Sequence, residues 1–198
     1  MMKIEVKGLD GIAKRLRQIA DPHRRNIALS MAVNKAITKA KTEMVRAITQ
    51  EYQVKRAVVE ERLKVHKASA KGGSILIQAT LAASNRAKGR SMNMIHFLKG
   101  KRHFKWGSGK ALQVQIKRRG GRKALPGAWV GNSGRTVFIR KGTERMPIRV
   151  MNTIDIPQMF NARMIKGRVV KAIRATLKVE VERAVTLMLK KDVFPGRP

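Results

Sequence analysis

The chain has 198 residues, of which 43% are hydrophobic and only 4% aromatic, and it carries 45 Lys and Arg against 12 Asp and Glu, a formal net charge of +33. This length and apolar content allow a folded domain with an aliphatic, Met-rich core and exclude a disordered polycation. The sequence contains no cysteine and no apolar run of membrane-spanning length, which excludes disulfides, thiolate metal sites and a transmembrane helix.

Acidic residues are confined to the two end regions of the sequence. None occurs from Arg62 to Thr143, a stretch in which Lys and Arg recur throughout. Ordinary surfaces mix both signs of charge, so this stretch indicates that its partner is a polyanion, an acidic protein surface, or both. The N-terminal segment has no apolar signal core and carries acids early, so we expect synthesis and residence in a cytoplasm-like compartment.

The N-terminal part predicts a short strand followed by helices. Alternation marks a strand over Lys3–Lys7, and apolar spacings of three and four mark a short helix over Leu9–Ala20. Asp21-Pro22 is a typical helix start, from which one apolar stripe predicts a long helix to about residue 50. That stripe consists of Leu29, Val33, Ile37, Ala40, Met44 and Ile48. A further short helix is predicted over Gln53–Lys64.

The middle of the chain predicts strands separated by basic turns. Alternation marks strands within residues 62–69, 72–82 and 111–118, and another pair flanks Asn132-Ser133-Gly134. Residues 86–123 are rich in glycine and cations. We interpret them as a basic, extended loop or hairpin insertion, of which the stretch before the strand at 111–118 packs poorly without a partner.

A second long helix is predicted near the C-terminus. Its apolar residues recur at strict four-residue spacing, at Ile165, Val169, Ile173, Leu177, Val181, Val185 and Leu189. The cations that lie off this stripe are Lys166, Arg168, Lys171, Arg174 and Lys178. The order of elements predicts an α+β fold in which an antiparallel β-sheet packs against two long α-helices, one N-terminal and one C-terminal. We expect residues 1–198 to form one domain, with residues 86–123 as an insertion within it.

The titratable residues form no pattern typical of catalysis. His23, His66, His96 and His103 lie in separate cationic neighbourhoods, and no HExxH, GxSxG, P-loop or dinucleotide-binding motif occurs. We therefore expect no enzymatic activity, no metal and no cofactor, and we interpret the histidines as surface or phosphate-contacting residues.

A nucleic-acid role has more support. Phe97, His103, Phe104 and Trp106 interleave with cations, and such planar groups stack on bases while cations hold phosphates. The alternative, that Phe97 and Trp106 are core anchors, stays open. The cations predicted to contact nucleic acid or a neighbouring protein are Arg86, Lys88, Arg90, Lys99, Lys101, Arg102, Lys105, Lys110, Lys117, Arg118, Arg119, Arg122 and Lys123.

An ordered series of short motifs, "GAWVGN", "GRTVFIRKGTERMPIRV" and "IDIPQMF", precedes the last helix. This series resembles the minor tail protein Z family of tailed phages and prophages. The matching residues are Phe138, Arg140, Lys141, Gly142, Arg145, Pro147, Ile148, Pro157, Gln158 and Met159. The Gly-Pro-Ser that is usual in the family before the Pro-Gln pair is replaced here by residues 152–155.

The resemblance implies a structural role in tail completion at the head-proximal end of the tail, in a ring, commonly hexameric, around the DNA path. The implied partners are further copies of the chain, tail-terminator and head-connector proteins, and duplex DNA contacted without regard to sequence. The implied location is the neck of the virion after synthesis in the host cytoplasm. The residues assigned to a turn or subunit interface are Arg140, Lys141, Gly142, Arg145, Pro147 and Pro157, although turn geometry alone also explains Gly142 and Pro147. The alternative is a free, sequence-independent nucleic-acid-binding protein of ribosomal or chromatin type.

Overall fold

The computed structural model describes residues 14, 17, 19, 21–69, 79–83, 91–99 and 111–193, the last three of these without their side chains. The chain divides into two compact units. The helical unit comprises Met1–Met44, Leu63–Ala83 and Arg163–Pro198, and the sheet unit comprises Val45–Arg62 and Ser84–Ala162. The strand expected over residues 3–7 and most of the helix expected over 9–20 lie outside the described residues.

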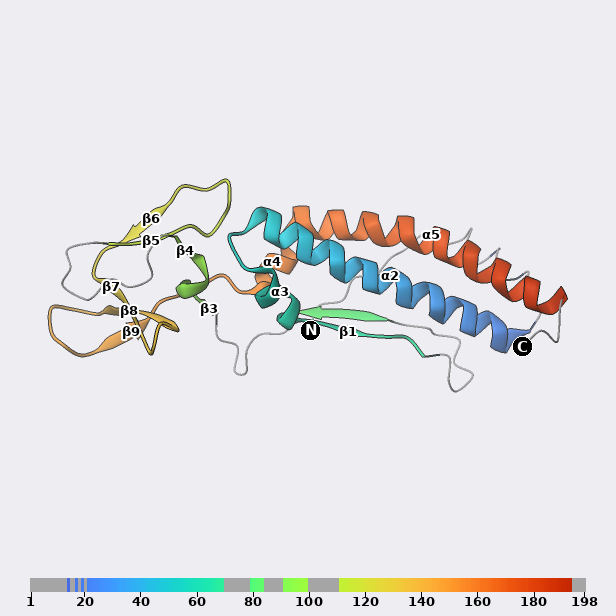
Figure 1. Cartoon of the computed structure of the whole chain (residues 1–198), viewed down its shortest axis with the longest axis horizontal. Helices are drawn as coiled ribbons and strands as arrows, with labels where there is room; N and C mark the ends of the chain where they lie inside the picture. The colour runs from blue at the N-terminus through green and yellow to red at the C-terminus, as the bar shows by residue number, and fades with distance from the viewer. Residues whose placement is uncertain are drawn as a thin grey trace. The chain divides into compact units, whose positions relative to one another are not determined.

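Four α-helices and ten short strands are described (Figure 1). The helices are α2 (Pro22–Glu51), α3 (Arg56–Arg62), α4 (Ile156–Asn161) and α5 (Arg163–Val193), with a 3-10 turn, η1, at Met94–Phe97. The strands are β1 (Leu63–His66), β2 (Thr80–Ala83), β3 (Met92–Asn93), β4 (Leu98–Lys99), β5 (Leu112–Val114), β6 (Lys123–Leu125), β7 (Ala128–Gly131), β8 (Thr136–Arg140), β9 (Ile148–Val150) and β10 (Asn152–Thr153). Both long helices therefore form where the sequence predicts them.

The start of α2 follows from its first residues. The backbone N–H of His23 donates to Oδ1 of Asp21 at 2.8 Å, and the N–H of Arg25 donates to the carbonyl of Asp21 at 3.0 Å. These bonds satisfy backbone donors that have no partner inside the helix, while Pro22 at the first helical position has no N–H to satisfy. The predicted helix start is confirmed.

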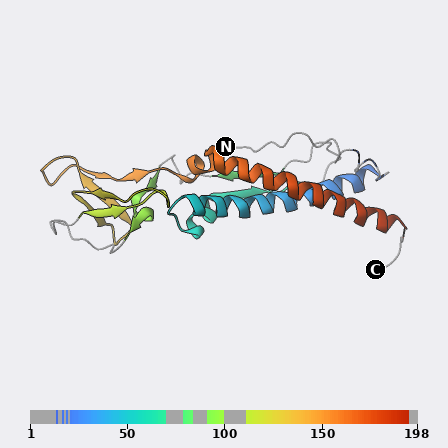
Figure 2. The same ribbon diagram turned by 90° about the horizontal axis from the view of Figure 1, so that it is seen from above.

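The core of the helical unit lies between α2 and α5, which run side by side in both views (Figures 1 and 2). The buried residues of α2 in this core are alanines, Ala28, Ala32 and Ala36, whereas Leu29 and Val33 are only partly buried beside it. The predicted stripe is thus displaced by one residue in this part of the helix. Alanine lets two helix backbones approach closely, and the larger side chains then cover the flanks of the contact.

On α5 the predicted four-residue spacing is confirmed from Ile165 through Val185, where every member of the stripe is buried. Leu189, the last member, is only partly buried. A step of four residues turns about 400° around a helix, so each member is displaced by about 40° from the one before. The buried face of α5 therefore winds gradually around the helix axis.

Within the helical unit, β1 and β2 form an antiparallel pair in which Leu63 lies opposite Ala83 and His66 lies opposite Thr80. The side chain of Asn34 ties the chain after β1 to α2. Its Nδ2 donates to the carbonyl of Ala68 at 2.9 Å, and its Oδ1 accepts from the N–H of the same residue at 2.7 Å. One amide side chain thereby replaces a pair of strand hydrogen bonds at this point.

The described strands of the sheet unit form three antiparallel sheets, β10-β3, β4-β5-β6 and β7-β8-β9. Their shared core consists of Ile95, Leu112, Ala128 and Val137. Asn93 joins two of the sheets, because its Oδ1 accepts hydrogen bonds from the N–H groups of both Ile95 and Val137 at 2.9 Å. The α+β class with two long helices is confirmed, and the described strands form small antiparallel sheets instead of one continuous sheet.

Residues 152–155, which stand where the family usually has Gly-Pro-Ser, lead into a capped helix. Asp155 is the N-cap of α4, and Oε1 of Gln158 accepts from the Asp155 N–H at 3.0 Å, which completes a capping box. Pro157 occupies the first turn, and Met159 is fully buried. The Pro-Gln-Met run is therefore the first turn of a short helix anchored in the core.

Candidate nucleic-acid and neighbour interface

The basic segment 86–123 is described at residues 91–99 and 111–123. Seven of its predicted contact residues lie outside the described part, namely Arg86, Lys88, Arg90, Lys101, Arg102, Lys105 and Lys110. In the described part, Ile95 and Leu112 belong to the core and Phe97 is 0% exposed. This part is well packed, contrary to our interpretation, and Phe97 is a core anchor that cannot stack on bases.

The described cations of this segment gather mainly on the turn between β5 and β6. Arg118, Arg119 and Arg122 are exposed on this turn, as are Lys117 at its start and Lys123 where β6 begins. Lys99 is half-buried on β4. The structure thus brings five of the thirteen predicted residues together, at one of the basic turns that the sequence predicts between its middle strands.

Two of these cations are engaged with the C-terminal end of α2. Nε of Arg118 donates to the carbonyl of Thr49 at 2.6 Å, and its backbone N–H donates to the carbonyl of Glu51 at 2.9 Å. Nζ of Lys117 lies 3.9 Å from Oε1 of Glu51. A helix end has unpaired carbonyls and a partial negative charge, so these contacts stabilise the end of α2. Next to these two residues, the side chains of Arg119, Arg122 and Lys123 are also exposed, so they add positive charge to this part of the surface.

The second motif of the series, residues 134–150, forms a hairpin of β8 and β9. Residues 141–147 connect the two strands, and all of them are exposed, including Lys141, Gly142, Arg145 and Pro147. The Lys141 N–H donates to the carbonyl of Pro147 at 3.1 Å and closes the ladder below this connection. Cζ of Arg140 lies 5.8 Å from the ring centroid of Trp129, within cation–π range. Five of the six assigned residues therefore belong to one hairpin, and Pro157 lies apart in α4.

A cationic face on α5 is missing from the site predicted from the sequence. Its residues are Arg168, Lys171, Arg174 and Lys178, all exposed. At 100° per residue the four lie within an arc of about 120°, opposite the buried residues of the same turns, and they extend over about 15 Å. No acid interrupts the helix between Arg163 and Val179. The signal is present in the sequence, as cations lying off the apolar stripe, although the site predicted from the basic segment and the motif series does not include these residues.

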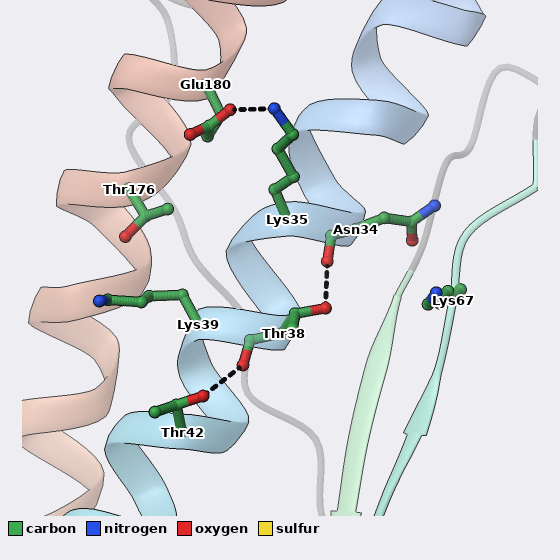
Figure 3. Close-up of a pocket in the computed structure, with 8 residues that line it drawn as sticks. All are labelled: Asn34, Lys35, Thr38, Lys39, Thr42, Lys67, Thr176 and Glu180. Carbon is green, nitrogen blue, oxygen red and sulfur yellow. Dashed lines mark hydrogen bonds and ion pairs between the residues drawn. The ribbon is translucent and has the colours of Figure 1, made fainter.

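In the helical unit, an open groove of about 470 Å³ lies beside the core formed by α2 and α5 (Figure 3). It is lined by Asn34, Lys35, Thr38, Lys39, Thr42, Lys67, Thr176 and Glu180. Nζ of Lys35 on α2 lies 3.0 Å from Oε2 of Glu180 on α5, and Arg183 contacts the other carboxylate oxygen at 2.8 Å. The hydrogen bond from Lys35 is the main cause that holds the pKa of Glu180 below its ordinary value, and the positive charges of Lys35 and Arg183 add to it.

The described residues hold no group of three or more His, Asp or Glu side chains placed to bind a metal ion. His23 and His66 are exposed, His96 is half-buried in η1, and His103 lies outside the described part. Among the helices that the structure describes, none is both long and apolar enough to cross a membrane.

Comparison with known proteins assigns the chain to a family. No curated protein and no solved structure matches it. The family described as prophage minor tail protein Z (GPZ) matches residues 6–193, nearly the whole sequence and far beyond the short motif series. The chain therefore belongs to the prophage minor tail protein Z family, a family of structural proteins of the phage tail.

Proposed function

We propose that this minor tail protein completes the head-proximal end of the tail and joins it to the head-side connector. In this role several copies surround the DNA path as a ring, and their cations contact DNA without regard to sequence. The family match over residues 6–193 carries the proposal. The exposed cations on α5 and on the β5–β6 turn support it, because phosphate contacts of this type need no base recognition.

The net positive charge is large enough to support both contact with DNA and docking to neighbouring proteins. A ring about 40 Å tall encloses duplex DNA with roughly 24 phosphates. The formal charge of +33 on each copy means that even one copy carries more positive charge than that length of DNA can neutralise. The remaining cations face solvent, counterions or acidic surfaces of neighbouring proteins, which favours electrostatic docking to tail-terminator and head-connector proteins.

Mass photometry of the purified protein with and without duplex DNA tests the ring, and electron microscopy of particles made without the protein tests tail completion. We expect a concentration-dependent oligomer of defined size, and tails that assemble but do not join heads. A persistent monomer that selects structured RNA would instead identify a free nucleic-acid-binding protein. Heads and tails that join normally without the protein would contradict its role in completion.

A further inference from the structure

The strand β9 is an edge of its sheet. The order of this sheet is β7-β8-β9, so β9 pairs with β8 on one side and with no described strand on the other. Edge strands expose backbone groups that pair readily with another chain, and natural proteins commonly protect them with charged side chains or with proline. Here Pro147 precedes the strand, but Ile148 and Val150 within it are 41% and 43% exposed.

The register shows which backbone groups face outward. Lys141 bonds to Pro147 and Met151 bonds to Val137, at 3.1 and 2.9 Å. Hydrogen-bonded pairs alternate along an antiparallel ladder, so Arg149 forms the next such pair with its partner Ile139. The backbone N–H and C=O groups of Ile148 and Val150 therefore point away from β8, toward the open edge.

The side chains of this strand divide by face. Residues directly opposite each other share a face, so Val150 lies in a row with Phe138 and Trp129, and Ile148 lies beside Arg140. The rings of Trp129 and Phe138 lie 6.0 Å apart, and both side chains are half-buried. Arg149 lies on the opposite face. On this outer face, the row of Trp129, Phe138 and Val150 therefore continues as apolar surface to the open edge, beside the cation Arg140.

Charge identifies the occupant of this edge. Residues 135–150 contain Arg135, Arg140, Lys141, Arg145 and Arg149 but only one acid, Glu144. Two copies of this hairpin would repel each other, whereas an acidic segment is attracted. We propose that β9 binds an extended, acidic segment of a partner protein, which adds a fourth strand to β7-β8-β9. Apolar residues of that segment lie beside Ile148 and Val150, and its acidic residues lie on the face of Arg149.

The proposal goes beyond tail completion and does not depend on it. A labelled nine-residue peptide of alternating Val and Glu is titrated into the full-length protein, and fluorescence anisotropy measures the Kd. A peptide of the same composition, with its valines and glutamates in separate blocks, controls for charge alone. We expect the alternating peptide to bind at least about 10-fold more tightly, because only this pattern fits both faces of an added strand.

Two variants locate the binding. Val150→Pro removes an outward-facing N–H but keeps the hydrogen bonds to β8, and proline is tolerated on edge strands. Ile148→Thr with Val150→Thr keeps the strand propensity but removes the apolar side chains. Each change should weaken binding of the alternating peptide about 10-fold. The matched control Leu187→Thr, at a 50% exposed residue of α5, should leave the Kd unchanged.

Hydrogen exchange gives an independent measurement on the unaltered protein. Bound peptide should slow exchange of the Ile148 and Val150 amides, while general electrostatic attraction leaves both exchanging as in the free protein. Equal affinity for the two peptides, or unprotected amides at saturation, would overturn the proposal. It would also be overturned if single-stranded DNA, and not the peptide, protects these amides, because the outer face would then be a nucleic-acid platform.

Discussion

Arg62 and Asp155 lie 93 positions apart in the sequence and form an ion pair inside the sheet unit. Nη1 of Arg62 lies 3.2 Å from Oδ1 of Asp155, and the two side chains are 11% and 6% exposed. Arg62 ends α3 and Asp155 caps α4, so one contact joins two short helices. The same Oδ1 accepts from the N–H of Ile156 at 2.8 Å, which couples the ion pair to the helix cap.

Removal of one member of this pair should destabilise the protein strongly. Arg62→Met leaves a buried carboxylate without this cation and should lower the free energy of unfolding by about 3 kcal/mol. Arg62→Met combined with Asp155→Asn should recover part of the loss, because Asn is neutral and still caps α4. Urea unfolding of the two single variants and the double variant measures the coupling. Additive effects would show that the pair is not coupled in stability.

Acid should weaken the contact between α2 and α5. The pKa of Glu180 is lowered in the folded protein, chiefly by the hydrogen bond from Lys35. Its ionised form therefore contributes stability above its unfolded pKa of about 4.3, and this stability is lost as the pH falls through the lower folded pKa. Between roughly pH 5 and pH 3 we expect Glu180→Gln to lose less free energy of unfolding than the unaltered protein loses. Urea unfolding at several pH values in this range measures the difference. Lys35→Met should raise the pKa of Glu180, followed by NMR; an unchanged pKa would contradict the stated cause.

Two glycines should respond to alanine in opposite directions. A Cβ at Gly131 would lie 3.0 and 3.1 Å from Cε2 and Cδ2 of Phe138, so the ring has to move, and Gly131→Ala should cost about 1 kcal/mol. An added Cβ at Gly167 in α5 meets no atom within 4 Å, and Gly167→Ala should stabilise the helix by about 0.5–1 kcal/mol. Thermal unfolding measures both. Stabilisation by Gly131→Ala would show that the ring of Phe138 accommodates the methyl group without cost.

Duplex DNA binding should distinguish the cations of α5 from those of the basic segment. One variant replaces the α5 cations Lys171, Arg174 and Lys178 by Gln. A second variant replaces the basic-segment cations Lys99, Lys101, Arg102 and Lys105 by Gln. Each lost phosphate contact should reduce the slope of log K against log salt by about 0.9, and a charge control replaces the exposed Lys55 and Lys64. Fluorescence anisotropy at several salt concentrations measures the slopes. An unchanged slope would show that the altered residues do not contact phosphates.

Local signals in the sequence were enough to predict the two long helices and the α+β class. The periodic apolar residues of α5 and the Asp21-Pro22 start of α2 are local signals, because helix formation depends on residues three and four positions apart. The ordered motif series also resembled the family that the match over residues 6–193 shows. The excess of cations is likewise evident from the composition. Composition alone, however, does not show which cations contact a partner.

Which surfaces of these elements are buried, paired or left open depends on contacts between residues that are distant in the sequence. The sequence predicts Val33 as a core residue of α2, where the structure buries Ala32, and it leaves open whether Phe97 stacks on bases or packs in the core. Each outcome depends on what the rest of the chain packs against these residues. The sequence likewise does not predict that Arg62 and Asp155 form a buried ion pair, or that the strand containing Val150 lies at the open edge of its sheet. Burial and pairing are properties of residues that are distant in sequence, and local periodicity carries no information about which distant surfaces meet.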